Sequence, residues 1–149
     1  MLADILVGAS TGAFNIVVHA LLTVSTIRVA RNVAGRDTMH PWARMVAIMI
    51  ATVLVLMAAH TVEVFVWSVI YALTNAAPDG SDLFYFAFVN YTTLGYGDIT
   101  PVARWRLLGP MTAMNGVLLF GWSTAVIFEV LRRAISDHAP AARGGASSS

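Results

Sequence analysis

The chain contains no cysteine and no lysine, and it has few charged residues of either sign. Without cysteine it has no disulfide, no thiolate metal site and no cysteine nucleophile. Only 11% of its 149 residues are charged, whereas about a quarter of the residues of a soluble domain are charged. The net charge of +1 gives no reason to expect a nucleic-acid partner. Together these shortages argue against a soluble domain.

The chain has long hydrophobic runs and few charged residues. Hydrophobic residues make up 58% of the chain, and the mean hydropathy is +0.72. Runs at residues 5–27, 45–73 and 107–131 are each long enough for a membrane-spanning helix, which needs about 20 residues. The first run lacks the basic start and the cleavage site of a signal peptide. We therefore predict an all-α membrane protein with three transmembrane helices per chain.

The stretch between the second and third runs, residues 74–106, cannot cross the membrane as one helix. Pro78, Asp79 and Gly80 form a turn signal, and Ser81 is the expected N-cap of a short helix over residues 82–91. Irregular backbone at membrane depth must be buried in protein or line a water-filled cavity. The stretch is therefore predicted to be re-entrant, with a short helix followed by a returning strand of irregular structure.

A heptapeptide with two glycines follows this short helix. Its residues are Thr92, Thr93, Leu94, Gly95, Tyr96, Gly97 and Asp98. Because glycine readily adopts left-handed conformations, glycine at alternate positions lets successive carbonyls point the same way. Such a column of carbonyl oxygens can replace the hydration shell of a cation. The heptapeptide resembles the selectivity filter of tetrameric potassium channels, and the resemblance covers residues 45–131.

The resemblance implies that four identical chains each contribute one filter strand. K⁺ would then be coordinated by the backbone carbonyls of four consecutive residues: Thr93, Leu94, Gly95 and Tyr96. The Thr93 hydroxyl would add a further ligand for the innermost ion. Leu94 stands where valine is commoner, with its side chain expected behind the filter, and Asp98 is expected at the outer mouth.

The short pore helix departs further from the family pattern. Phe86 and Tyr85 stand where family members often have two tryptophans, so only Tyr85 keeps a polar group that can reach Asp98. Val89 stands where some members place a glutamate that supports the filter. That support must then come from elsewhere, and Glu63 is the candidate because helix rise places it at the height of the filter.

Glu63 lies within the second hydrophobic run, where an ionisable residue usually has a function. It is interpreted as a hydrogen-bonded carboxyl near the outer end of its helix or as a brace for a pore helix or filter. His60 lies one turn away on the same face, so the pair makes structural contacts, modulates the channel with pH, or forms half of a metal site. Estimated heights of about 13 Å for His19 and about 24 Å for His60 argue against a shared site. Asn15 and His19 are expected to face protein.

The third run resembles the pore-lining inner helix of the family. Gly116 is interpreted as a hinge or as a site of close helix packing, and Gly121 as a packing site. The resemblance assigns Val117, Phe120 and Thr124 to the wall of the central cavity. Phe120 could also narrow the pore enough to gate it by dewetting.

Arginine is distributed unevenly between the two ends of the predicted spans. Four arginines lie between the first two runs and three follow the third, but only two lie in the re-entrant stretch. The positive-inside rule then places the N-terminus and the re-entrant stretch outside and the C-terminus in the cytoplasm.

We therefore expect a homotetrameric potassium-selective channel in a prokaryotic plasma membrane, with K⁺ as the permeant ion and no organic cofactor. Residues 1–44 form the first helix and a basic loop, residues 45–133 the pore domain, and residues 134–149 a disordered tail. Membrane lipid and an unidentified regulatory subunit are the further candidate partners. The alternatives are a less selective monovalent cation channel and a non-conducting, channel-like subunit that acts as a partner or sensor. No catalytic motif points to an enzyme.

Overall fold

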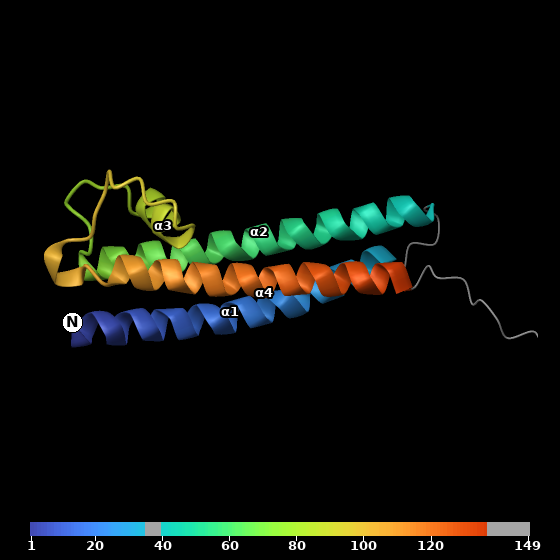
Figure 1. The fold of residues 1–149 in the computed structure, drawn as a ribbon, viewed down its shortest axis with the longest axis horizontal. Helices are drawn as coiled ribbons and strands as arrows, with labels where there is room; N and C mark the ends of the chain where they lie inside the picture. The colour runs from blue at the N-terminus through green and yellow to red at the C-terminus, as the bar shows by residue number, and fades with distance from the viewer. Residues whose placement is uncertain (35–39, 137–149) are drawn as a thin grey trace, which may run out of the picture.

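The computed structural model describes residues 1–34 and 40–136, and this part of the chain is helical without strands (Figure 1). The elements are α1 (Leu2–Ala34), α2 (Pro41–Thr74), α3 (Leu83–Tyr91), the 3-10 turn η1 (Ala103–Trp105) and α4 (Leu108–Ser136). Three of them, α1, α2 and α4, are long and apolar enough to cross a membrane. The predicted all-α fold with three candidate transmembrane helices is confirmed.

The long helices extend beyond the hydrophobic runs that predicted them. α1 continues to Ala34, so Arg28 and Arg31 belong to the helix rather than to a loop. α4 continues to Ser136, which is inside the segment predicted to be a tail. Hydropathy marks only the part of a helix that is suited to lipid, and polar turns can continue it on either side. The remaining tail, residues 137–149, and Arg36 of the predicted basic loop lie outside the described residues.

Local sequence signals account for the ends of α2 and the start of α3. Pro41 opens α2, where its fixed φ suits the first turn. Asn75 ends α2 in the left-handed conformation that asparagine tolerates. The predicted cap of α3 is wrong by one residue, because Asp82 rather than Ser81 accepts the backbone N–H groups of the first turn. A carboxylate also interacts favourably with the positive end of the helix dipole.

The two helices α2 and α4 lie side by side in the middle of the molecule, with α1 on one side and α3 on the other (Figure 1). α1 and α3 each pack against both central helices. The N-terminus and the re-entrant segment with α3 lie at the same end of the bundle. This placement agrees with the prediction that both are on one side of the membrane, and the assignment of that side to the outside stays a prediction.

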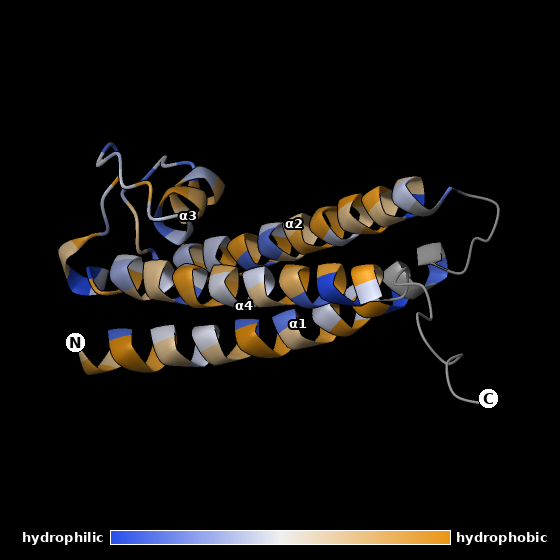
Figure 2. Cartoon of the chain, turned by 45° about the vertical axis from the view of Figure 1, so that its right-hand side comes forward, coloured by the Kyte–Doolittle hydropathy of each residue, from blue (hydrophilic) through white to orange (hydrophobic). Residues whose placement is uncertain are grey.

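Hydrophobic residues are spread along all three long helices (Figure 2), and many of their large side chains are exposed, while several polar side chains are buried. Phe14, Leu54 and Phe128 are exposed, one on each of the three long helices. Asn15 and His19, by contrast, have no exposed surface. The prediction that these two residues face protein is confirmed, and the exposed surface is suited to contact with lipid or neighbouring chains.

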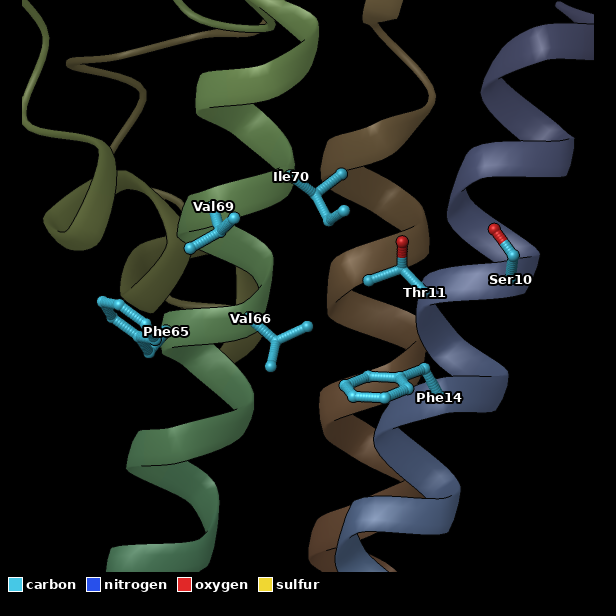
Figure 3. A pocket seen from close by; sticks show the side chains of 7 residues that line it. All are labelled: Ser10, Thr11, Phe14, Phe65, Val66, Val69 and Ile70. Atoms are coloured by element: carbon cyan, nitrogen blue, oxygen red, sulfur yellow. The ribbon is translucent and has the colours of Figure 1, made fainter.

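A groove of about 390 Å³ lies between α1 and α2, near the end of the bundle that carries the N-terminus and α3 (Figure 3). Its lining residues are Ser10, Thr11, Phe14, Phe65, Val66, Val69 and Ile70. The hydroxyls of Ser10 and Thr11 both bond to the carbonyl of Val7 in their own helix. The polar groups of the groove are therefore already satisfied, and the polar chemistry of the chain lies elsewhere.

A buried core fastens α3 onto α2 and the start of α4. Its residues are Val64, Trp67, Tyr71, Ala76, Ala77, Phe86, Ala87, Tyr91, Trp105 and Leu108. The segment that follows the heptapeptide is tied to the same region, since the Val102 N–H donates to the Ala76 carbonyl at 2.8 Å. These contacts fix both ends of the re-entrant segment relative to the long helices.

Candidate functional site

The glycine-bearing heptapeptide begins directly where α3 ends, and its first N–H groups turn back toward that helix. The N–H of Thr93 donates to the Asn90 carbonyl at 3.0 Å. The N–H groups of Leu94 and Gly95 both donate to the Val89 carbonyl, at 3.0 and 3.4 Å. Val89 thus supports the segment through its backbone. Among the described residues, no hydrogen bond occupies the carbonyl oxygens of residues 93–96.

Positive φ angles recur at every second residue of the segment. They are 60° at Thr93, 59° at Gly95 and 78° at Gly97, while Leu94 and Tyr96 keep negative values. The glycine positions agree with the predicted alternation. The alternation also includes Thr93. The residue type did not predict this, because a β-branched residue rarely adopts a positive φ. Strain of this kind is concentrated at functional sites.

The side chains of the segment find little cover within one chain. Leu94 is 52% exposed and Tyr96 is 69% exposed. Leu94 was expected to lie behind the filter, inside the protein, and the chain's own residues do not bury it there. Nothing in the described part of a single chain supplies the opposite wall of a conduction path.

The outer end of the segment is held by the contact predicted between Tyr85 and Asp98. The Tyr85 hydroxyl donates to the Asp98 carboxylate at 2.7 Å. This hydrogen bond raises the pKa of the Tyr85 hydroxyl, because loss of its proton would leave two negative charges in contact. The segment is therefore tied to α3 at both ends, through backbone bonds near Val89 and through a side-chain bond near Tyr85.

Glu63 joins the end of α3 to the long helices. It is fully buried, and one of its carboxylate oxygens, Oε2, accepts the hydroxyl hydrogen of Tyr91, the last residue of α3. Nδ1 of His60 lies 3.0 Å from the same oxygen. Both interpretations of Glu63 describe part of what is observed: it is a hydrogen-bonded carboxyl, and it contacts α3, the predicted pore helix of its own chain. Tyr91 was not among the predicted site residues.

His19 belongs to the same cluster, so the separation inferred from estimated heights is wrong. Its Nδ1 lies 2.7 Å from Glu63 Oε1, and its ring centroid is 5.4 Å from that of His60. Part of the error came from the end of α1, which continues to Ala34. Counted from the observed helix ends, His19 lies about 22 Å along α1 and His60 about 28 Å along α2, so the estimated difference in height falls from about 11 Å to about 6 Å.

Gly116 lies where α4 packs closely against the end of α3. A Cβ placed on it would lie 2.0 Å from the Tyr91 carbonyl oxygen. Close packing therefore accounts for this glycine, while a hinge at the same position stays a prediction. Gly121 differs, because a Cβ there would meet no atom of the described chain within 4 Å. The packing predicted for Gly121 is not found within one chain.

The residues assigned to the cavity wall lie on the exposed side of α4. Val117 and Thr124 are exposed, and Phe120 is partly covered by the rings of His60 and Tyr91, at centroid distances of 4.6 and 5.4 Å. Their role in lining a cavity stays a prediction, since one chain does not enclose one. Because His60 and Tyr91 both contact Glu63, the ring of Phe120 lies between the exposed side of α4 and the buried cluster around Glu63.

Comparison with known families adds one finding to this geometry. A family model described as an ion channel matches residues 59–133, which is half of the chain and includes α3, the heptapeptide and most of α4. No curated protein and no solved structure matches the chain. The match indicates a channel rather than an enzyme, and with three candidate spans it indicates an integral membrane protein. The chain belongs to the ion channel family.

Proposed function

We propose that four copies of this chain assemble into a channel that conducts K⁺ selectively and passively. The alternating positive φ angles at Thr93, Gly95 and Gly97 are the observation that carries the proposal. Together with N–H groups turned toward α3, they leave a run of carbonyl oxygens available to a dehydrated cation. Residues 45–133 are the pore domain in this proposal, and the end that carries α3 faces the outside.

Conduction would use only backbone oxygens and one hydroxyl of each chain. Carbonyls of residues 93–96 from four chains replace the water around K⁺, and repulsion between neighbouring ions moves them onward. The Thr93 hydroxyl donates its hydrogen to the Thr92 carbonyl at 2.6 Å. Its oxygen lone pairs are therefore free to face an ion.

The exposure of the filter supports assembly as a ring. Irregular backbone at membrane depth is tolerated only against protein or water. In a single chain, Leu94 and Tyr96 are covered neither by protein nor by an enclosed body of water. The same holds for the exposed rings of Phe84 and Phe88 on α3. Neighbouring chains around a common axis would cover these side chains and enclose a water-filled path. Val117, Phe120 and Thr124 would then line the inner cavity.

A pair of glycine substitutions tests the proposal in liposomes that contain the purified protein. Gly97 and Gly80 both have φ of 78°, and an added Cβ would meet nothing within 4 Å at either. Alanine therefore costs about 1 kcal/mol of backbone strain at both positions, but only Gly97 lies in the proposed filter. We expect Gly97→Ala to lower K⁺ flux by about tenfold or more, and Gly80→Ala to leave it near the wild-type value.

Other outcomes of the flux measurement distinguish the alternatives. Equal K⁺ and Na⁺ flux through the wild-type protein would support a less selective cation channel. Absence of flux for both ions would support a non-conducting subunit. An equal loss of flux in the two alanine variants would contradict the assignment of the filter, because it would trace the effect to folding.

A further inference from the structure

Two histidines and a glutamate that the proposed conduction path does not use converge beside the pore helix. They are His19 from α1 and His60 and Glu63 from α2, and one ligand atom from each lies within 4.8 Å of the others. We propose that this cluster binds a divalent transition-metal ion of the Zn²⁺ class. The proposal does not depend on which ion the channel conducts.

The donor set matches the preference of such ions. Imidazole nitrogens and a carboxylate oxygen are common ligands of Zn²⁺ in proteins. Both Nδ1 atoms already face the carboxylate, at 2.7 Å from Oε1 for His19 and 3.0 Å from Oε2 for His60. Bonds of about 2.0 Å to a tetrahedral ion would place neighbouring ligand atoms about 3.3 Å apart. Since the three ligand atoms now lie within 4.8 Å of one another, binding needs the side chains to draw together around the ion.

The surroundings of the two rings are suited to metal-bound imidazoles. A histidine that binds a metal through one nitrogen usually donates the hydrogen on the other to an acceptor. Here Nε2 of His60 and Nε2 of His19 lie 2.9 and 3.4 Å from one hydroxyl oxygen, that of Ser123 on α4. A serine oxygen has two lone pairs and can accept from both rings. Ser123 would thus orient both imidazoles with Nδ1 toward the metal.

A fourth ligand and a compensating charge are also at hand. The Tyr91 hydroxyl lies 2.9 Å from His60 Nδ1, and its oxygen can accept a hydrogen bond from a water molecule that acts as the fourth ligand. The His60 side chain is 15% exposed and gives the cluster an edge from which an ion or a water molecule can enter. Glu63 is fully buried, and a divalent cation would offset the high cost of holding a carboxylate at membrane depth.

A metal bound here would tie three elements together. It would join α1 to α2 directly, and it would reach Ser123 on α4 and Tyr91 at the end of α3 through their hydrogen bonds. Since Tyr91 precedes the filter, the ion would stiffen the support of the filter from behind. The expected effect of a ligand that binds only the folded protein is a higher thermal midpoint.

The wild-type protein provides the first test. The protein is purified in detergent without a histidine tag, stripped with a chelator and titrated with Co²⁺, whose visible absorption reports a site of low coordination number. We expect one Co²⁺ per chain, displaced by Zn²⁺, and a thermal midpoint that rises with Zn²⁺ but not with Mg²⁺. A wild-type protein without the Co²⁺ band and without stabilisation by Zn²⁺ would overturn the proposal.

Single substitutions assign the ligands. His19→Ala should weaken Co²⁺ binding by about a hundredfold, and Ser123→Ala by about tenfold because it removes only the orienting hydroxyl. His40→Ala removes an exposed histidine outside the cluster and should leave binding unchanged. If His19→Ala does not fold, His60→Gln takes its place. Binding that is equal in the wild-type protein and in the ligand variant, or lost equally in His40→Ala, would contradict the site. Because detergent-solubilised protein carries no flux, this result is independent of the proposed conduction.

Discussion

At the scale of single residues, Gly116 leaves less room for a side chain than any other glycine that the structure describes. A Cβ at this position would lie 2.0 Å from the Tyr91 carbonyl oxygen and 3.0 Å from the Tyr91 carbonyl carbon. These are backbone atoms at the end of a helix fixed by its core, so they cannot move aside cheaply. The residue that follows Tyr91 is Thr92, the first of the proposed filter.

We therefore predict that Gly116→Ala destabilises the protein. Overpacking typically costs about 1–3 kcal/mol, and we expect it to exceed the gain of about 1 kcal/mol that alanine brings to a helix interior. The measurement is the thermal midpoint in detergent, followed by tryptophan fluorescence. Gly12→Ala is the matched control, because its Cβ would lie 3.7 Å from the Asn115 amide, an ordinary contact. A Gly116→Ala protein as stable as the Gly12→Ala protein would contradict the packing described here.

Local sequence patterns predicted those contacts of the site that join residues close together in the sequence. The heptapeptide follows α3 directly, and Tyr85 and Asp98 are separated by only 13 residues. Tyr91 and His19 were missed as partners of Glu63 because those contacts join residues 28 and 44 positions apart. Such contacts depend on where helices end and cross, which hydrophobic periodicity does not determine. The positive φ of Thr93 is likewise imposed by its surroundings against its own preference.

At the scale of elements, α1 is bound to the channel domain by buried amide groups. The Asn15 amide donates to the Asn115 side-chain oxygen at 3.1 Å and to the Glu63 carbonyl at 3.3 Å. Trp67 Nε1 donates to the same Asn115 oxygen at 3.0 Å. The position of α1 could not be predicted from the family resemblance, which begins at residue 45. Its polar residues did predict that it would face protein.

We predict that Asn15→Leu loosens α1 from α2 and α4. Side-chain hydrogen bonds between membrane helices are worth about 1 kcal/mol each, so the loss of two should lower the free energy of unfolding by about 1–2 kcal/mol. The thermal midpoint measures the effect. Ser25→Ala serves as the control, because this exposed hydroxyl bonds only to the Leu21 carbonyl of its own helix. An equal response of the two variants would show that the amide bonds do not hold α1 in place.

At the scale of the whole molecule, a single chain does not enclose a conduction path. The proposed filter segment is anchored to α3, yet the described residues of the chain leave the side chains of Leu94 and Tyr96 largely exposed. The hydrophobic runs predicted the number of long helices, and the heptapeptide predicted the re-entrant segment between the last two. Hydrophobic runs do not predict contacts between copies of the chain. The ring of four chains is therefore inferred from the exposed side chains and from the chemistry of the carbonyl oxygens.

The reversal potential of the purified wild-type channel in a planar bilayer tests this inference most directly. With K⁺ on one side and Na⁺ on the other, the account predicts a large reversal potential that follows the K⁺ gradient, because only K⁺ replaces its water with filter carbonyls at little cost. A reversal potential near zero with equal concentrations of the two salts would contradict K⁺ selectivity, and the absence of any current would contradict conduction.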